Sequence, residues 1–482
     1  MSLKIQGGIV VAWSGSHHVL IPDGTVVIEK DRITYVGTDR SVAADQVIDA
    51  SGKLVCPGFI NLHVHSQLNT GDYLITDVTK KDYLGANYFV FGASAKEKRP
   101  SPPAEALALG AKYALLSALK NGASTILDPG GGVADPEAYA EIVGQVGGRV
   151  FYSPPYRSSD IFTDSEGRHY YEERPDGGRA GFQKAVDFIR RFHGHHNGRL
   201  QGILNPAQAE TCEPALLEET VAAARDLQVG IHIHAGGNLR EFLRILERHR
   251  KGVVEYLAST GILTPRTILG HLVFIEGHSR IDYPAGDTLK LMAESGASVG
   301  HCPHKYAKMA GVMESFDRYV EAGINVGLGT DTYPLDIVSE MRYASLFSRL
   351  VDRKYYGARP AEVFNAATVW GAKALGREDL GKIAQSAKAD IAIVDLRTLR
   401  YGPARDPVTA LVEYGGGADV DTVIVDGEIV IDQGRSTRID EGELFARAEA
   451  TANRAWDNWQ GRDWAGRKTE EIIPPAFPTR KD

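Results

Sequence analysis

The middle of the chain alternates between short apolar segments and longer segments whose apolar residues recur with helical spacing. Residues 104–124 have this helical spacing, and a nearly continuous apolar segment begins at residue 124. Further apolar segments follow at residues 148–154, 200–206, 229–237, 297–303 and 324–334. Parallel strands that are buried on both faces have such continuous apolar sequences. Six or more of these units between residues 57 and 380 predict an α/β fold, a (β/α)8 barrel of the TIM type rather than an open sheet.

The two ends of the chain have a different pattern, in which apolar and polar residues alternate between turn residues. Residues 7–13, 24–37 and 46–58 are typical of strands. Residues 389–396 and 421–434 repeat the pattern, and an Asp-Gly pair in the second segment indicates a hairpin turn. We therefore expect one small β-sandwich domain assembled from both ends. The expected division is 1–56 and 381–437 for this domain, 57–380 for the barrel, and 438–482 for a C-terminal helix and tail.

Composition places the 482-residue chain among ordinary globular proteins, with 43% hydrophobic and 24% charged residues. The net charge of −8 gives no basic surface for nucleic acid or an anionic membrane, and no apolar run is long enough to span a bilayer. The first residues lack the pattern of a signal peptide, and three scattered cysteines do not make a disulfide framework. We therefore expect a reduced cytoplasmic protein that binds neither nucleic acid nor membrane.

Polar residues stand at the ends of several apolar segments. His63 and His65 end one of them, and both imidazoles share a face because alternate side chains of a strand point the same way. Later candidate strands end in the same manner, in His232, His234, His271, His301, His304 and Asp331. Active sites of (β/α)8 barrels lie where the strands end. Neutral imidazole is a common metal ligand and a buried carboxylate needs a partner, so the pattern predicts a divalent metal site with hydrolytic chemistry.

Histidines in two other places lack this setting. His193, His195 and His196 lie among Arg, Gly and Asn with no apolar segment before them. His17 and His18 lie in the N-terminal β region. We expect both groups to be solvated rather than to bind a metal.

The chain resembles the amidohydrolase superfamily, in particular its chlorohydrolase and aminohydrolase branch, which includes deaminases. LVCPGFINLHVHSQ at residues 54–67 is similar to the first-strand motif of that branch. NGASTILD, GIHIHAG, ILGHLVFI, GHCPHKYAKMAG and VGLGTDTYP follow in the family's order and approximate spacing. The resemblance covers nearly the whole chain. It implies a distorted (β/α)8 barrel, a small-molecule substrate, a homo-oligomer and one divalent metal ion, Zn²⁺ by default, although the ligand types also suit Fe²⁺, Mn²⁺ or Co²⁺.

The resemblance also implies a role for each polar residue at the strand ends. The metal ligands would be His63, His65, His234 and Asp331. His234 is favoured over His232 because the family's ligand is the second histidine of that pair. Asp331 would also accept a proton from the attacking water and pass it to the leaving group. His271 would contact the metal or its water and help to stabilise the developing oxyanion, and His301 would have a structural role.

Two positions depart from the family's pattern. Deaminases of the family usually carry a glutamate three residues after the fifth-strand ligand, where it protonates a ring nitrogen of the substrate. This chain has Gly237 there, and we expect no acidic residue nearby. The seventh-strand motif is altered as well, because His304, Lys305 and Tyr306 replace small polar residues and an asparagine. These changes favour attack on an already electrophilic carbonyl or amidine carbon over ring deamination, which depends on a general acid, unless His304 or Lys305 serves as that acid.

Residues just beyond the strand ends are candidates for contact with the substrate. They are Gln67, Asn69, Asn238, His304, Tyr306 and Tyr333. Tyr73, Tyr83, Tyr88 and Phe89 follow the first strand and would form either an aromatic wall for a flat substrate or a contact between subunits.

Three functions are compatible with these residues. The first is hydrolysis of a C–N bond other than a peptide bond, either deamination of a heterocyclic amine or cleavage of a urea, amide or carbamate. The second is a triazine-type chlorohydrolase or dealkylaminating hydrolase. The third is a metal-binding barrel that has lost catalysis, which the missing glutamate suggests. Because every expected metal ligand is retained, the sequence favours an enzyme over this third hypothesis.

Overall fold

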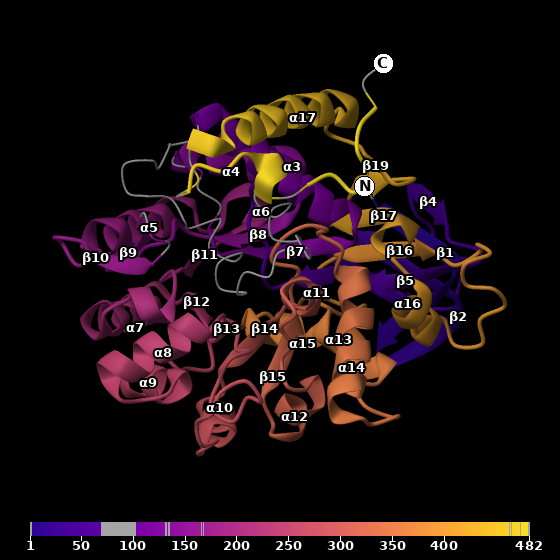
Figure 1. Ribbon diagram of the computed structural model, residues 1–482. Helices are drawn as coiled ribbons and strands as arrows, with labels where there is room; N and C mark the ends of the chain where they lie inside the picture. The colour runs from indigo at the N-terminus through magenta and orange to yellow at the C-terminus, as the bar shows by residue number, and fades with distance from the viewer. Residues whose placement is uncertain are drawn as a thin grey trace.

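The computed structural model describes residues 2–68, 103–130, 133, 135–164, 166, 168–461, 463, 465–472 and 474–480. It consists of a barrel of parallel strands beside a second sheet that both ends of the chain share (Figure 1). The candidate residues Asn69, Tyr73, Tyr83, Tyr88 and Phe89 lie outside the described residues.

The barrel is a sheet of eight parallel strands that nearly closes on itself. In spatial order they are β6 (Phe59–Asn61), β7 (Ala123–Asp128), β8 (Arg149–Tyr152), β11 (Leu200–Leu204), β12 (Gly230–Ala235), β13 (Thr267–His271), β14 (Ser298–His301) and β15 (Asn325–Leu328). The last strand meets the first through a hydrogen bond from the Leu62 amide to the Leu328 carbonyl oxygen, 2.8 Å long, and through a parallel bridge between Val64 and Asp331. The predicted TIM-type barrel is confirmed.

Helices cover the outside of the barrel (Figure 1). Their bounds are α3 (Ala104–Lys120), α4 (Pro136–Val146), α5 (Arg179–Phe192), α6 (His195–Gly198), α7 (Pro214–Leu227), α8 (Leu239–His249), α9 (Val253–Ser259), α10 (Thr288–Ser295), α11 (Pro303–Lys308), α12 (Phe316–Glu321), α13 (Ile337–Asp352), α14 (Pro360–Ala366) and α15 (Val369–Ala374). In α5 the buried residues Ala185, Phe188, Ile189 and Phe192 recur three and four residues apart, so one face of this helix packs on the sheet.

The barrel also carries short elements that the sequence pattern did not indicate. They are the hairpin of β9 (Ser159–Thr163) and β10 (His169–Glu173) and the 3₁₀ helix η2 (Ala209–Thr211). The expectation for His195 and His196 agrees with the structure, because both are exposed. The expectation for His18 was wrong. Its ring packs against Trp13 and Phe364, and burial lowers its pKa to about 4.

Strands from both ends of the chain form one connected sheet. Its strands are β1 (Ser2–Trp13), β2 (His18–Glu29), β3 (Arg32–Gly37), β4 (Gln46–Asp49), β5 (Lys53–Pro57), β16 (Ile391–Asp395), β17 (Val420–Val425), β18 (Glu428–Asp432) and β19 (Arg435–Ser436). Central β5 pairs with both β1 and β16, which joins the two ends. Asp426 and Gly427 form the predicted turn between β17 and β18, with φ of 50° and 76°. This sheet has an apolar core of its own, which includes Ile5, Val26 and Ile391.

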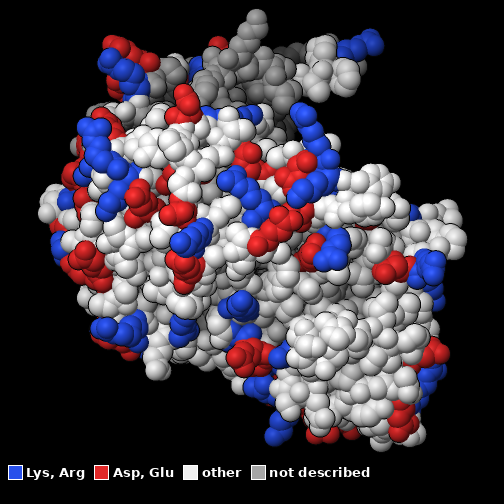
Figure 2. All heavy atoms as spheres, turned by 90° about the horizontal axis from the view of Figure 1, so that it is seen from below, with Lys and Arg blue, Asp and Glu red and all other residues white. Residues whose placement is uncertain are grey.

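The remaining helices follow this sheet. They are α16 (Pro407–Tyr414), η3 (Gly417–Asp419), α17 (Glu441–Asp457), η4 (Trp459–Gly461) and α18 (Thr469–Ile472). Helix α17 packs against α3 of the barrel (Figure 1). None of the described helices combines the length and the apolar character needed to cross a bilayer. On the face seen in Figure 2, basic and acidic side chains are interspersed rather than gathered into one basic area.

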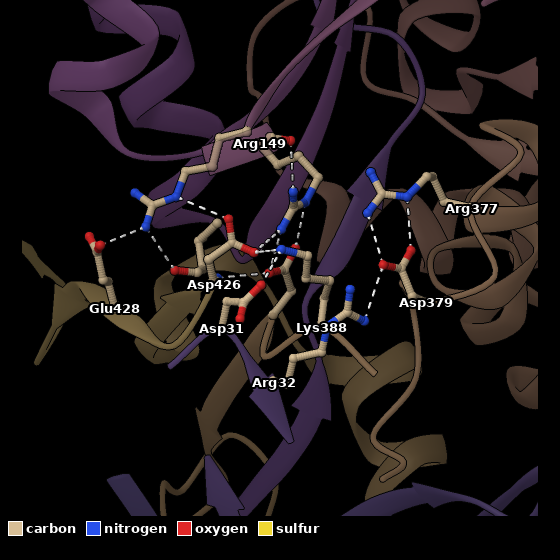
Figure 3. A network of polar contacts seen from close by, with 12 residues as sticks. Asp31, Arg32, Arg149, Arg377, Asp379, Lys388, Asp426 and Glu428 are labelled. Carbon is tan, nitrogen blue, oxygen red and sulfur yellow. Dashed lines mark hydrogen bonds and ion pairs between the residues drawn. The ribbon is translucent and has the colours of Figure 1, made fainter. Parts of the chain in front are cut away.

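A buried network of charges joins the barrel to the end sheet (Figure 3). Arg149, at the first residue of β8, is fully buried and contacts Asp390 through Nε at 3.0 Å and Asp426 through Nη2 at 2.6 Å. Lys388 and Arg199 also contact Asp426, at 2.8 and 3.3 Å. Because Arg149 begins its strand, the network lies at the opposite end of the barrel from the strand ends that carry the histidines.

Candidate metal centre

The structure brings the predicted ligands together at the carboxyl ends of the barrel strands. His63 and His65 follow β6, His234 lies in β12, His271 ends β13, and Asp331 follows β15. The ligand atoms of the set His63, His65 and Asp331 lie within 4.8 Å of one another, and so do those of His63, His234 and His271. Four separate strands therefore supply nitrogen and oxygen donors to one small volume.

Hydrogen bonds orient two of these imidazoles toward the centre. The Nδ1–H of His65 donates to the carbonyl oxygen of Gly130 at 3.1 Å, and the Nδ1–H of His234 donates to that of Ala207 at 2.6 Å. Both Nε2 atoms then carry a lone pair in the neutral form, and they face each other at 3.2 Å. Burial lowers the pKa of His234 to about 3, which keeps this ring neutral. Two lone pairs placed in this way can both bind a cation that lies between or beside them.

The third imidazole, that of His63, completes the set. Its Nε2 lies 3.4 Å from Nε2 of His65, and its Nδ1 lies 3.0 Å from Nε2 of His232. Burial and the surrounding imidazoles hold the pKa of His63 well below its usual value. His232 therefore supports His63 from behind and does not face the centre. Gly270 makes room for this pair, because a Cβ there would lie 2.9 Å from the His63 ring and 3.0 Å from His232.

The spacing of the nitrogens fits a metal ion. Four-coordinate Zn²⁺ with bonds of about 2.0–2.1 Å holds its ligand atoms about 3.3–3.4 Å apart. The Nε2 atom of His65 lies 3.2 Å from that of His234 and 3.4 Å from that of His63. Imidazole nitrogen and carboxylate oxygen are ligands that Zn²⁺ accepts. The donor set and its spacing are therefore those of a divalent metal site.

Asp331 lies against two imidazoles and one ammonium group. Its Oδ1 is 3.6 Å from Nε2 of His65, and its Oδ2 is 3.3 Å from Nε2 of His271. The ammonium of Lys305, a buried residue of α11, donates to the same Oδ2. Burial raises the pKa of Asp331, but the Lys305 ammonium and the imidazoles outweigh this effect and hold that pKa below its usual range. Asp331 is therefore an anion whose two oxygens face different partners.

Two of the polar residues at the strand ends have backbone conformations that non-glycine residues rarely adopt. The φ angle is 88° at His271 and 62° at Asp331. Such conformations cost on the order of 1–3 kcal/mol each and persist where the surrounding structure imposes them. Here the Asp331 amide donates to the His63 carbonyl oxygen at 2.7 Å, and the amide of Leu272 donates to that of Ala235 at 2.9 Å. Both side chains thus leave their strands through sharp, hydrogen-bonded turns.

A carboxylate lies close to Gly237, so the expectation that no acidic residue is nearby was wrong. Glu241, in the first turn of α8, accepts hydrogen bonds from the amides of Gly236 at 3.0 Å and Gly237 at 2.7 Å. Burial raises its pKa to about 8. The sequence Asn238-x-x-Glu241 is a signature of a helix N-terminus and could have revealed it. Asn238 itself caps α8 by accepting from the Glu241 amide at 3.0 Å.

Tyr306 fills the space beside Gly237. Its hydroxyl donates to the Gly237 carbonyl oxygen at 3.1 Å, and the residue is 1% exposed. A Cβ built on Gly237 would lie 3.3 Å from that hydroxyl and 3.6 Å from Cδ2 of His271. Gly237 and Tyr306 are thus in direct contact, and a phenol stands beside the position where the resemblance led us to expect a glutamate.

The other candidate residues lie just beyond the ends of β6, β14 and β15 along the chain. His304 is half-buried, its ring stacks on Tyr343 at 4.8 Å, and burial lowers its pKa. Gln67 and Tyr333 are half-buried and lie two residues beyond His65 and Asp331 along the chain.

His301 and Cys302 lie at the end of β14 and are buried. Burial lowers the pKa of His301 to about 3. The Cys302 thiol forms a third group with His271 and Asp331 in which the ligand atoms lie within 4.8 Å, and sequence reasoning did not single it out.

Known proteins resemble this chain in sequence and in fold. The model of the amidohydrolase family matches residues 54–430. A 5'-deoxyadenosine deaminase of Methanothermobacter thermautotrophicus is 32% identical over 435 residues, which are 89% of this chain and 94% of that protein. A 5-methylthioadenosine/S-adenosylhomocysteine deaminase of Thermococcus onnurineus is 31% identical over 435 residues, which are again 89% of this chain and 94% of that protein.

Solved structures share the fold at lower identity. An adenosine deaminase from Xanthomonas campestris with bound zinc superimposes with a TM-score of 0.77 at 22% identity, over 94% of this chain and 98% of that one. Atrazine chlorohydrolase from Arthrobacter aurescens, complexed with zinc, gives a TM-score of 0.78 at 22% identity, over 93% and 100%. With the family model matching most of its length, the chain belongs to the amidohydrolase family.

Proposed function

We propose that the protein hydrolyses a C–N bond other than a peptide bond in a small molecule, with the help of a bound divalent metal. The observation that carries the proposal is the convergence of imidazoles and the Asp331 carboxylate from separate strands on one volume. Relatives named as deaminases, which act on C–N bonds, support this reaction class. The retained ligand set favours an enzyme over a barrel that has lost catalysis.

The metal would be a single Zn²⁺ ion held by His63, His65, His234 and Asp331. The Nε2 spacings of 3.2 and 3.4 Å support one coordination sphere, and solved structures with the same fold contain zinc. Such an ion lowers the pKa of a bound water from 15.7 toward about 7 and so supplies a nucleophile at neutral pH.

Asp331 would transfer the protons, and His271 would stabilise the negative charge that develops on oxygen. Asp331 accepts the proton of the attacking water and later gives it to the departing nitrogen, so that no net proton is consumed. His271 Nε2 lies 3.3 Å from Asp331 Oδ2, and its N–H is therefore placed to donate to an oxygen that gains charge beside that carboxylate. Burial holds the pKa of His271 well below its usual value, so the ring acts as a neutral donor.

The substrate would contact Gln67, His304, Tyr306 and Tyr333, which stand around the strand ends. Asn238, which we also predicted to bind substrate, uses its side-chain oxygen to cap α8. We further propose that the protein works in the cytoplasm as a homo-oligomer. A second candidate reaction, triazine dechlorination or dealkylamination, is favoured by the structural likeness to atrazine chlorohydrolase.

The test is a substrate panel assayed with metal-quantified protein. Purified protein is analysed for bound metals and then incubated with aminopurines, pterins, triazines, phenylureas and carbamates. The products distinguish the reactions: ammonia from deamination, an amine with or without carbon dioxide from amide, urea or carbamate cleavage, and chloride from dechlorination. Turnover that disappears with the metal supports the proposal. Purified protein without metal, insensitive to chelators and inactive after zinc is supplied would contradict it.

A further inference from the structure

A buried carboxylate at the end of β7 connects the segments that follow the first two barrel strands. Asp128, the last residue of β7, is fully buried and accepts hydrogen bonds on both of its side-chain oxygens. Its Oδ1 accepts from the Gly130 amide at 2.8 Å. Its Oδ2 accepts from the hydroxyls of Ser66, which follows β6, and Tyr139, which lies in α4. One side chain therefore joins three segments at the carboxyl end of the barrel.

The carbonyl oxygen of Gly130 orients the imidazole of His65. This oxygen lies 3.1 Å from Nδ1 of His65. Because a carbonyl oxygen only accepts hydrogen bonds, Nδ1 carries the proton, and Nε2 of the neutral ring carries the lone pair. Asp128 thus holds the amide of the same residue whose carbonyl oxygen sets the tautomer and the direction of the His65 ring.

The turn at Gly130 admits no side chain. Its φ angle is 110°, and a Cβ built there would lie 2.5 Å from Cγ of Pro155. The hydrogen bond from its amide to Asp128 therefore holds a turn whose shape is already specific. Metal-binding histidines commonly donate their other ring N–H to such a carbonyl oxygen, and loss of these partners typically lowers metal affinity by about 10- to 100-fold.

The other oxygen of Asp128 holds the backbone beside His65. Ser66 follows His65 directly and is fully buried, and its hydroxyl donates to Oδ2. Tyr139 donates to the same oxygen from α4, where its ring stacks on Tyr152 with the centroids 3.7 Å apart. The two hydroxyls thus share one acceptor, but Ser66 adjoins the proposed metal ligand and Tyr139 belongs to a helix that covers the barrel.

We propose that Asp128 is a positioning residue of the metal site, which holds His65 in the tautomer and orientation that bind the metal through Nε2. This inference rests on the proposed function, because it takes His65 as a metal ligand. Asp128 acts on His65 through the Gly130 turn and through Ser66. Removal of its carboxylate should therefore release the imidazole and weaken the binding of the metal.

The experiment measures the zinc affinity of the full-length protein and of four variants by competition with a chelator. Asp128→Leu removes both acceptor oxygens, and Asp128→Asn keeps an oxygen for the Gly130 amide. Ser66→Ala and Tyr139→Phe are a matched pair, because each removes one hydroxyl that donates to Oδ2. Thermal unfolding of the zinc-free proteins measures the cost to the fold. Visible absorption of the Co²⁺-loaded proteins reports the geometry of the ligands.

We expect Asp128→Leu to bind zinc about 10- to 100-fold more weakly than the wild type and to have an altered Co²⁺ spectrum. Asp128→Asn should regain most of this affinity, since its Oδ1 can still accept from the Gly130 amide. Ser66→Ala should bind zinc about fivefold more weakly, which corresponds to the loss of one hydrogen bond. Tyr139→Phe should unfold at a lower temperature but keep the zinc affinity and the Co²⁺ spectrum of the wild type.

Two results would overturn the role of Asp128 and leave the proposed function standing. One is wild-type zinc affinity and a wild-type Co²⁺ spectrum in folded Asp128→Leu and Ser66→Ala. The other is an equal loss of zinc affinity in Ser66→Ala and Tyr139→Phe, which would indicate a general loss of stability. If Asp128→Leu does not fold, this matched pair alone decides. A wild-type protein that neither binds zinc nor turns over any substrate contradicts the proposed function itself.

Discussion

The backbone amide of Asp331 donates to the carbonyl oxygen of His63 at 2.7 Å, which joins the segment after the last barrel strand to the segment after the first. The amide of His65 donates back to the carbonyl oxygen of Asp331 at 3.0 Å. The closure of the barrel and the assembly of the candidate metal site are therefore the same set of backbone contacts. Because these contacts are made by the backbone, we expect side-chain substitutions in this region to leave them in place.

Replacement of Asp331 should abolish turnover while the barrel persists. Asp331→Asn keeps an oxygen that accepts from Lys305 but removes the negative charge and the basic site, so we expect kcat to fall by at least about 10³-fold and the metal to bind more weakly. Asp331→Ala should lose turnover as well. Asp282→Asn, at an exposed position, is the control. Circular dichroism and metal analysis check the fold and the site. A folded variant with wild-type kcat would contradict the assignment.

Removal of the metal should lower both activity and stability. A ligand that binds only the folded state stabilises it by about 2.7 kcal/mol at a free concentration 100 times its Kd. Dialysis against a chelator should therefore remove turnover and lower the unfolding temperature, because the lone pairs of His65 and His234 then face each other without a cation. Added zinc should restore both. Full turnover by metal-free protein would rule out the proposed chemistry.

The charge network at the other end of the barrel should affect stability alone. Arg149 is fully buried against Asp390 and Asp426. Removal of one partner from such a pair leaves an uncompensated buried charge and costs about 3–5 kcal/mol. Arg149→Met should lower the free energy of unfolding in urea by this amount, with kcat unchanged in the fraction that remains folded. Arg168→Met, which removes an exposed ion pair, should have little effect. Equal stabilities of the two variants would refute this account.

The same network predicts a loss of stability in acid. Burial raises the pKa of Asp426, but Arg149 and Lys388 outweigh this effect, and the pKa in the folded protein lies below its usual value. A depressed pKa contributes stability above the unfolded-state pKa of about 3.9, and this contribution disappears as the pH falls through the folded-state value. Unfolding free energy should therefore decrease below about pH 4, and less steeply in Asp426→Asn. An equally steep decrease of the unfolding free energy in the wild type and in Asp426→Asn would contradict this prediction.

The contact between Gly237 and Tyr306 should appear as an energetic coupling. A Cβ at position 237 would lie 3.3 Å from the Tyr306 hydroxyl and 3.5 Å from Oε2 of Glu241, so the side chain of Gly237→Glu would crowd both groups. We expect it to destabilise the fold by about 1–3 kcal/mol. In the presence of Tyr306→Asn, which removes the phenol, the same change should cost at least about 0.5 kcal/mol less. Additive effects in a urea-denaturation cycle would show that the two positions are independent.

The sequence by itself determined the barrel, the β-strand character of both chain ends and the places along the chain where the candidate ligands stand. Continuous apolar strands, helical spacing and the Asp426–Gly427 turn are local patterns. They can be recognised in the sequence because they depend only on residues that are close together along the chain. His63 and His65 share a face because strand side chains alternate, whatever lies elsewhere in the chain. A polar residue at the end of several apolar segments therefore already indicated the candidate metal site.

Only the tertiary structure decided which distant groups meet. His63 contacts His232, which is 169 residues away, and Arg149 contacts Asp390, which is 241 residues away. Lys305 donates a hydrogen bond to Asp331, and Tyr306 donates one to Gly237. These contacts form because the segments that follow β12, β14 and β15 meet at one end of the barrel. No periodicity encodes such pairs, since they depend on the register of strands and the packing of whole helices. The electrostatics of the site follows from these contacts, because the pKa of a buried titratable group depends on the charges and hydrogen-bond partners that lie next to it in space.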